Sequence, residues 1–347
     1  MKKAIRFVIG MDLGDRWTSV SVLDRRTGEE TESTRVRTTR EAMDAFFAGR
    51  GRCRVVMESG THSPWTSRAA SRRGHDVIVA DARRVRAIWD SPKKNDRRDA
   101  LLLAQMGAAP GGLLKPVRHR GERAQSELAV LRARECVVDA RTALINAARG
   151  AVKAFGHRLP ACSSASFHRK AKEALPEALR PALEPLLDAA AALTATIESY
   201  DAQVERLCAL HPETARLRQV GGVGPVTSLA FALVIDDPAR FARIRDVGAY
   251  LGVAPRQDQS GDSDKQLGIT KCGDRLMRRL LVQCAHRILG PFGADCDLRR
   301  WGLELARRGG ANAKKRAVVA VARKLAVLLL ALWKNDSDYE PLRKQAA

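Results

Sequence analysis

An unbroken apolar repeat in the second half of the chain constrains the fold more than any other feature. Between residues 183 and 207 an apolar side chain recurs every three or four residues without a miss. This spacing draws one continuous apolar stripe along a long helix, which another helix must cover, so the sequence predicts a coiled coil. The repeat consists of Leu183, Leu186, Ala190, Leu193, Ile197, Tyr200, Val204 and Leu207.

An earlier segment supplies a second helix that can cover this stripe. The pattern turns helical at Glu122, with apolar side chains seven residues apart at Leu131, Val138, Ile145 and Val152. A polar stretch with Pro160, Pro176 and Pro181 follows, which allows the two helices to form an antiparallel hairpin. So regular a stripe equally allows pairing between two protomers, and the sequence alone does not choose.

Residues 1–110 alternate between strand and helix patterns. Strands are predicted at residues 5–11, 18–23, 31–37, 55–57 and 77–80, and helices at 40–47 and 64–73. Strands that lead into strand–helix–strand units indicate a mixed sheet flanked by helices, an α/β fold. Proline and glycine within 110–121 mark a linker.

The last part of the chain is expected to be mostly helical. Helices are predicted at residues 226–235, 244–250, 274–288 and 314–333. We therefore predict three parts, and the fold class is α/β plus α. They are an α/β domain at 1–121, a coiled-coil helical arm at 122–214 and a C-terminal domain at 215–347.

The chain carries a large positive charge. Lys and Arg number 61 against 39 Asp and Glu, which gives a formal net charge of +22. A surplus of this size favours a polyanionic partner, because Lys and Arg displace the counterions condensed on phosphates. Exchange of Lys for Arg in a high-GC genome does not create such a surplus. The charge therefore predicts nucleic-acid binding.

Cysteine use and hydropathy predict a cytoplasmic protein with no membrane partner. The seven cysteines are scattered and form no CxxC pair, which argues against a zinc ribbon or a disulfide framework. The apolar segment 317–333 is interrupted by Arg323 and Lys324. It is therefore expected to be a buried helix and not a membrane span.

Four acidic residues form the first candidate site. Asp12 and Glu58 end predicted strands, whereas Asp96 and Asp99 lie three residues apart at the start of a predicted helix. Carboxylates so placed can converge on one point and supply the oxygen ligands that Mg²⁺ prefers. Bound Mg²⁺ ions assist phosphodiester chemistry. A structural alternative makes Asp96 a helix N-cap and Asp99 an acid favoured by the helix dipole.

A glycine turn in the C-terminal part is a candidate phosphate contact. Gly222 and Gly224 lie just before the helix predicted at 226–235, and a glycine turn that opens a helix presents backbone N–H groups to a phosphate. The turn is similar to the hairpin of helix-hairpin-helix DNA-binding proteins. A tight turn between two helices explains the glycines equally well.

Ser260 is the candidate nucleophile. It lies in a polar, glycine-flanked segment that we expect to be a loop between helices, so its hydroxyl is exposed and free to attack phosphorus. Arg256, Lys265 and Lys271 can bind the scissile phosphate and offset developing charge. No general base beside Ser260 is evident, and the alternative is an ordinary solvated turn.

The acids resemble those of a known family. Asp12 in VIGMDLGD, Glu58 in VVMESG and the Asp96/Asp99 pair in KKNDRRDA resemble the DEDD tetrad of one insertion-sequence transposase family. The resemblance implies an N-terminal Holliday-junction-resolvase (RNase H-like) fold and recombination guided by a structured bridge RNA. Asn95 stands where the family motif has Thr, a departure that leaves the acids in place.

The same family carries a C-terminal motif that this chain matches. It reads Pro-Arg-x-x-x-Ser-Gly, followed by a segment with Gly and Lys and a helix of Leu and Arg. The matching residues are Pro255, Arg256, Ser260, Gly261, Lys271, Gly273, Arg278 and Leu281. The resemblance implies that Ser260 forms a phosphoserine link to DNA, with Ser263 as the only close rival.

We therefore expect a transposase or recombinase of a bacterial insertion sequence. Its expected partners are donor and target DNA, a guide RNA and further copies of the chain in a dimer or tetramer. One alternative is a metal-dependent nuclease or junction resolvase that uses water. Another is an actin-like ATPase or sugar kinase with a phosphate loop at residues 12–14, which leaves the charge unexplained. A DNA-coating protein with a degenerate site is the third.

Overall fold

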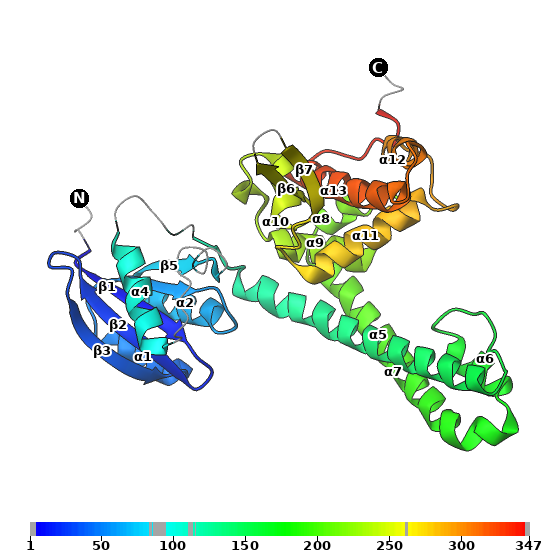
Figure 1. Ribbon diagram of the computed structural model, residues 1–347, viewed down its shortest axis with the longest axis horizontal. Helices are drawn as coiled ribbons and strands as arrows, with labels where there is room; N and C mark the ends of the chain where they lie inside the picture. Colours follow the sequence, from blue (N-terminus) through cyan, green and yellow to red (C-terminus); the bar gives the residue numbers. More distant parts are fainter. Residues whose placement is uncertain are drawn as a thin grey trace. The chain divides into compact units, whose positions relative to one another are not determined.

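The computed structural model describes residues 5–82, 85, 95–109, 114, 116–260 and 263–343, with only the backbone at 263–266 (Figure 1). The chain divides into two compact units, Met1–Arg120 and Gly121–Ala347. None of the described helices is both long enough and apolar enough to cross a membrane.

The first unit is built on a mixed five-stranded sheet, which confirms the sheet predicted from the sequence. Its strands are β1 (Phe7–Leu13), β2 (Trp17–Asp24), β3 (Glu30–Arg37), β4 (Arg54–Glu58) and β5 (Asp76–Ala80). The strand order is β3-β2-β1-β4-β5. The pairs β1–β2 and β2–β3 are antiparallel, whereas β1–β4 and β4–β5 are parallel.

Both faces of this sheet are covered. Ile9 and Val55 belong to the core shared with α1 (Arg40–Ala48) and α2 (Ser63–Arg72). Val8 and Val56 belong to a second core with α4 (Asp96–Ala108). Neighbouring residues of one strand thus enter opposite cores, because successive strand side chains point to opposite faces. This is why the central strands read as short, continuous apolar runs.

The segment predicted as a linker is only partly a linker. Its residues 110–113 and 115 lie outside the described part of the chain. The Val117 N–H donates to the Val79 carbonyl at 2.7 Å, and Pro116 forms an isolated bridge with Ala80. The second half of the segment is therefore attached to the edge strand β5.

The second unit contains a long helical arm, formed by α5 (Glu122–Ala154), α6 (Phe167–Glu173) and α7 (Arg180–Ala209) (Figure 1). The start of α5 shares a core with the end of α7, at Leu128 and Val204. The end of α5 shares a core with the start of α7, at Val152 and Leu183. The two helices are therefore antiparallel, and they cover one another within one chain.

The buried stripe of α7 differs from the predicted one at every second position. The fully buried residues are Leu183, Leu187, Ala190, Thr194, Ile197, Val204 and Cys208. The predicted members Leu186, Leu193, Tyr200 and Leu207 lie half-buried at its flank. The sequence pattern missed this register because two positions of the stripe are polar, Thr194 and Asp201, and a count of apolar residues passes over them. The Asp201 carboxylate accepts a hydrogen bond from Arg134 of α5 at 2.6 Å.

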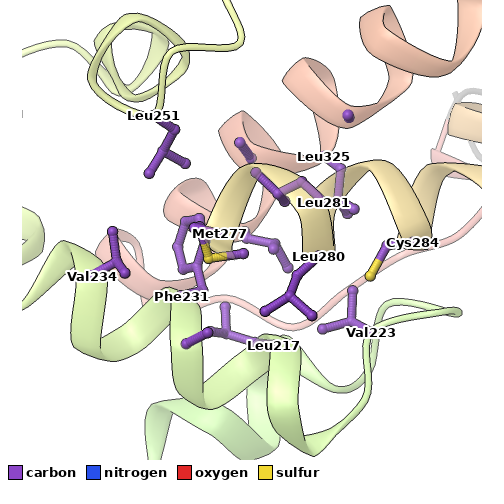
Figure 2. Packing of buried hydrophobic residues seen from close by; sticks show 14 of the residues in the cluster. Leu217, Val223, Phe231, Val234, Leu251, Met277, Leu280, Leu281, Cys284 and Leu325 are labelled. Atoms are coloured by element: carbon purple, nitrogen blue, oxygen red, sulfur yellow. The ribbon is translucent and has the colours of Figure 1, made fainter. Parts of the chain in front are cut away.

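The core of the second unit surrounds α9 (Pro225–Ile235), whose residues from Thr227 to Ile235 are all buried. Around it pack α8 (Glu213–Leu217), α10 (Val247–Tyr250), α11 (Arg275–Leu289) and α13 (Ala313–Lys334) (Figure 2). The base of the arm enters the same core through Leu128, Leu131 and Val204. The arm is therefore rooted in the C-terminal core. The sequence missed α12 (Asp297–Arg307).

The expected loop around Ser260 is wrong. The segment forms a two-stranded antiparallel sheet of β6 (Pro255–Ser260) and β7 (Ser263–Ile269). Every residue of β6 is exposed. A strand that buries neither face has no need of the apolar–polar alternation by which strands are recognised, so the pattern gave no signal.

Candidate functional site

Asp12 and Glu58 lie side by side at the ends of neighbouring strands. The parallel pair β1–β4 sets Met11 opposite Met57, so the next residue on each strand is an acid. Met11 and Met57 are buried in the core on the α1–α2 side. Because side chains alternate, both carboxylates point to the other face, where α4 packs. Both acids are half-buried.

Helix α4 brings the other two acids to the same end of the sheet. A Cβ placed on Gly107 would touch Val8 and Val56, whereas one on Gly10 would touch Ala100 and Ala104. The helix therefore runs antiparallel to β1. Its first turn, with Asp96 and Asp99, extends past Gly10 toward the strand end that carries Asp12.

The capping alternative for Asp96 is wrong, because Asn95 caps this helix. The Asn95 side chain accepts a hydrogen bond from the Arg97 N–H at 3.1 Å. Asp96 is exposed and Asp99 half-buried, both within the first turn, where the helix dipole favours acids. Residues 93–94, which begin the family motif here, lie outside the described part of the chain.

Carboxylate oxygens suit a hard divalent cation, and four of them gather at one end of this sheet. Among the described residues, however, no three acidic, histidine or cysteine side chains lie close enough to hold a metal ion together. The two acids on the strands and the two acids on α4 thus lie at the same end of the sheet, but they do not form a complete coordination shell. Residues 83–84 and 86–94, just before α4, are not described.

Ser260 lies at the exposed end of the β6–β7 hairpin. It pairs with Ser263 across the turn, and the next residue, Gly261, lies outside the described residues. Lys265 is opposite Asp258 in the register, and its side chain is likewise not described. An exposed hydroxyl at a hairpin end is open to a large substrate such as DNA.

Arg256 and Lys271 are not brought to Ser260. Both are exposed at the base of the hairpin, where Pro255 pairs with Ile269. Three residues of extended strand separate Arg256 from Ser260, so their Cα atoms lie about 13 Å apart.

The base of the hairpin is tightly built. Gly252 has a φ of 70°, and a Cβ there would lie 2.5 Å from the Cys272 nitrogen. A Cβ on Gly273 would lie 2.2 Å from the Tyr250 carbonyl oxygen. The Arg278 guanidinium donates to the Gly273 carbonyl at 2.7 Å. Gly273 and Arg278 of the matched motif therefore hold this base together. Lys271, two residues before Gly273, adopts the left-handed φ of 55°.

The two glycines of the turn before α9 differ. Gly222 has a φ of 91° and packs against Arg287 and Ile288 of α11, so a tight turn requires it. It also borders a hollow of about 320 Å³ that Arg287 and the exposed Phe292 help to line. A Cβ on Gly224 meets no atom within 4 Å, and no side chain caps α9 there. Of the two glycines, Gly224 directly precedes α9 and has free space beside it, so it is the better candidate for a phosphate contact.

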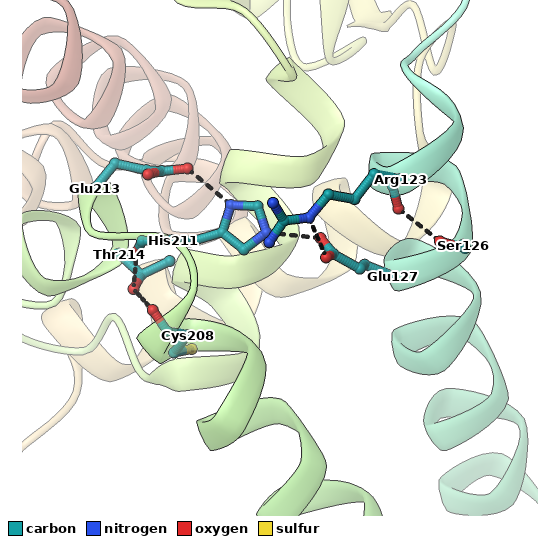
Figure 3. Close-up of polar contacts among 7 residues, drawn as sticks. All are labelled: Arg123, Ser126, Glu127, Cys208, His211, Glu213 and Thr214. Carbon is teal, nitrogen blue, oxygen red and sulfur yellow. Dashed lines mark hydrogen bonds and ion pairs between the residues drawn. The ribbon is translucent and has the colours of Figure 1, made fainter.

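A polar network that the sequence did not reveal joins α5 to the segment that follows α7, at the root of the arm (Figure 3). His211 lies between Glu127, at 2.6 Å, and Glu213, at 3.2 Å. Arg123 donates to the same Glu127 carboxylate at 2.8 Å. Burial acts to raise the pKa of Glu127, but the hydrogen bonds from Arg123 and His211 outweigh it and lower the pKa.

Ion pairs link the arm to α11, directly after the hairpin base. Arg132 of α5 contacts Asp274 at 3.1 Å, and Asp274 caps α11 by accepting from the Met277 N–H at 3.0 Å. Arg279 of α11 pairs with Glu135 and Asp139 of α5. The arm, α11 and the base of the hairpin are therefore mechanically connected.

A sheet with acids at adjacent strand ends, followed by a basic helical unit with an exposed serine, defines a DNA-processing class of protein. Residues 214–292 match the family profile described as "Transposase IS116/IS110/IS902 family". Residues 9–156 match a second profile, described as "Transposase", for DEDD transposases of the IS110 type.

Three curated relatives agree with these matches. A "Probable family 20 transposase" of Pseudomonas aeruginosa is 29% identical over 341 residues, which cover 96% of this chain and 98% of the relative. The "Transposase for insertion sequence element IS1111A" of Coxiella burnetii is 30% identical over 71% of this chain and 68% of its own. The "Transposase for insertion sequence element IS1328" of Yersinia enterocolitica is 29% identical over 80% and 83%.

The chain belongs to the IS116/IS110/IS902 family of transposases, with a DEDD domain followed by the family's C-terminal domain. As a transposase it is an enzyme that binds DNA. Its DEDD domain implies use of a divalent metal.

Proposed function

We propose that the chain recombines DNA by Mg²⁺-assisted transesterification through a phosphoserine intermediate. The single observation that carries this proposal is Ser260, exposed at the end of a hairpin in the unit that matches the transposase profile. The Ser260 oxygen attacks phosphorus, an O–P bond to the protein forms, and the bond to one DNA oxygen breaks. The serine proton leaves to a base, and the released DNA oxygen takes up a proton.

The second half of the reaction reverses the first. A hydroxyl of another DNA strand attacks the phosphoserine, the Ser260–phosphorus bond breaks, and a DNA phosphodiester forms. Each step exchanges one phosphoester bond for another, so rejoining needs neither water nor ATP. This conservation of bond energy is what separates a recombinase from a nuclease.

In this proposal Asp12, Glu58, Asp96 and Asp99 hold the metal. When bound there, Mg²⁺ offsets charge on the scissile phosphate and orients it. Support comes from the register of Asp12 with Glu58 and from the antiparallel course of α4. The mixed sheet, with three antiparallel strands followed by two parallel ones, fits the RNase H-like fold that we propose for this unit.

The exposed cations at the hairpin base have a separate part in this proposal. Arg256, Lys271 and the open turn at Gly224 bind DNA backbone phosphates away from the scissile one. Lys265 lies nearer the hairpin end along the register and is the better candidate for the scissile phosphate. We further propose three functional parts, namely the DEDD domain (1–121), the helical arm (122–214) and the serine domain (215–347).

The acids lie in the first unit and Ser260 in the second, so the reaction needs both units at one phosphate. We propose that this happens in a dimer or tetramer on donor and target DNA, with a structured RNA that selects sequence by base pairing. Within the family a residual alternative is a metal-dependent nuclease that uses water, in which Ser260 is only a turn residue.

A covalent-adduct assay separates the two reactions. End-labelled DNA carrying the element's ends is incubated with protein and Mg²⁺, and a protease-sensitive protein–DNA adduct is sought on a denaturing gel. We expect the adduct with the wild type and with Ser263→Ala, and none with Ser260→Ala. Strand cleavage without an adduct, undiminished in Ser260→Ala, would establish the hydrolytic alternative.

A further inference from the structure

The far end of the helical arm carries a concentrated positive charge that the proposed reaction does not use. Residues 149–172 contain six Lys and Arg and no Asp or Glu. They comprise the last turn of α5, the linking segment and most of α6. A run of like charge on a folded surface costs free energy through repulsion unless a counter-charge binds there.

The charge surrounds a hollow. A cavity of about 570 Å³ at the end of α5 is lined by Arg149, Lys153, Gly156, His157, Arg158 and Leu159. Lys153, His157 and Arg158 are exposed. In the described part of the chain, neither Lys153 nor Arg158 has an acidic partner within ion-pair distance. Their ammonium and guanidinium groups are therefore available to an anion.

The wall of this hollow is fixed before any ligand binds. The Arg149 guanidinium lies over the Phe167 ring, 5.0 Å from its centroid, and donates to the Pro160 carbonyl at 3.4 Å. Leu159 and Phe167 are buried together in the core of the arm's far end. A preformed site pays little ordering entropy when it binds.

An aromatic side chain stands beside the cations. Phe155 ends α5 and is 62% exposed, although burial is the rule for phenylalanine. Gly156 follows in the left-handed conformation, with a φ of 78°, and turns the chain back so that the His157 N–H donates to the Val152 carbonyl at 3.0 Å. Exposed rings among cations suit nucleic acids, which offer sugars and base faces next to phosphates.

We propose that this arm tip, residues 149–159, binds the phosphate backbone of duplex DNA. Leu131 of α5 belongs to the C-terminal core, and Lys153 lies 22 residues further along the same helix. At the helical rise this separation is about 33 Å. One turn of a DNA duplex is about 34 Å, so a duplex held by the C-terminal core presents the same face again at the arm tip. The arm tip is thus a second DNA-binding site, one turn of duplex away from the first site at the C-terminal core.

The salt dependence of binding tests this second site on the full-length protein. The probe is a linear 40-base-pair duplex, titrated at several salt concentrations with wild type and with Lys153→Ala/Arg158→Ala. Each cation that contacts a phosphate contributes about one to the slope of log K against log salt. We expect the slope of the double variant to be shallower by about two, with weaker binding at every salt concentration.

The matched control removes an ion pair on the same end of the arm. Lys172 contacts Asp188 at 3.3 Å, and Lys172→Ala/Asp188→Ala changes the surface without changing the net charge. We expect its slope to equal that of the wild type. An unchanged slope in Lys153→Ala/Arg158→Ala would overturn the proposal, as would a slope that changes equally in the control.

An 8-base-pair duplex and a hairpin RNA complete the test. The short duplex is about 27 Å long and cannot span core and tip, so the double variant should bind it with the wild-type slope. A slope change confined to the RNA would overturn the assignment to DNA. Failure of the Ser260 chemistry would leave these slopes untouched, because the assay measures binding and not cleavage.

Discussion

Asp12 and Glu58 occupy equivalent positions on adjacent parallel strands, because Met11 pairs with Met57 in the register of β1 and β4. Adjacent parallel strands lie about 4.8 Å apart, which is close enough for two carboxylates to share one cation. Like charges so placed repel unless a cation lies between them. The arrangement therefore predicts that a bound cation stabilises the close placement of the Asp12 and Glu58 carboxylates, and that both carboxylates are needed to bind it.

Removing either charge should abolish recombination and leave the fold intact. Asp12→Asn and Glu58→Gln keep the size of the side chain, so the sheet should be undisturbed, while the metal loses a ligand charge. Mg²⁺ should raise the unfolding temperature of the wild type more than that of either variant, because a ligand that binds the folded state stabilises it and each variant binds the metal less tightly. Thermal unfolding with and without Mg²⁺ measures this. Full activity in both variants would refute the acidic site.

Gly10 should be intolerant of any side chain. A Cβ there would lie 1.9 Å from the Ala100 carbonyl oxygen, and backbone atoms on both sides cannot move independently. We expect Gly10→Ala to destabilise the first unit by about 3 kcal/mol or more. Gly224→Ala, which meets nothing within 4 Å, should cost far less. Chemical denaturation of both variants provides the comparison, and equal stability would contradict the packing of α4 on β1.

The register of the arm can be tested with two leucines of the same helix. Leu187 is fully buried against α5, whereas Leu193 lies half-buried at the flank of the stripe. An aspartate at 187 leaves a buried unpaired charge, so Leu187→Asp should destabilise the arm by about 3 kcal/mol or more. Leu193→Asp should cost clearly less in the isolated chain. A larger effect at 193, together with a lower mass in solution, would instead indicate that the flank pairs protomers.

Lys271 should separate stability from activity. Its left-handed backbone costs a residue with a Cβ about 1–2 kcal/mol, and glycine avoids this cost. Lys271→Gly should therefore be more stable than the wild type by about 1 kcal/mol, yet bind DNA more weakly because a phosphate contact is lost. Lys271→Ala keeps the strain and should lose binding alone. Wild-type DNA affinity in both would show that this lysine does not contact DNA.

The root of the arm should loosen in acid. The pKa of Glu127 is lowered in the folded protein by Arg123 and His211 against the opposing effect of burial. A carboxyl with a lowered folded pKa stabilises the fold above its unfolded pKa, about 4.3, and loses that contribution as the pH falls through the folded value. Glu127→Gln should therefore lower the melting temperature at pH 7, and the difference from the wild type should vanish once the pH falls below the folded pKa. A difference that stays constant as the pH falls would contradict the linkage.

The sequence alone predicted the strands of the first unit and the long helices. The central strands of the first unit are buried on both faces, so their apolar runs were legible, and the long amphipathic helices showed their period over many turns. The family motifs are short strings of residues, so Asp12, Glu58 and the Asp96/Asp99 pair could be named as candidates without coordinates, and their role stays a prediction.

Three features depended on tertiary structure and not on local sequence pattern: the β6–β7 hairpin, the buried side of α7 and the placement of the four acids. A strand that buries neither face leaves no periodic signal, and for that reason the β6–β7 hairpin carrying Ser260 was expected to be a loop. The buried stripe of α7 depends on which side α5 covers. Thr194 can lie in this stripe because Arg141 of α5 donates a hydrogen bond to its hydroxyl. Asp201 is held there in the same way by Arg134 of α5. The four acids lie at one end of the sheet because the strand register and the direction of α4 put them there. Register is a property of paired strands and not of either strand alone.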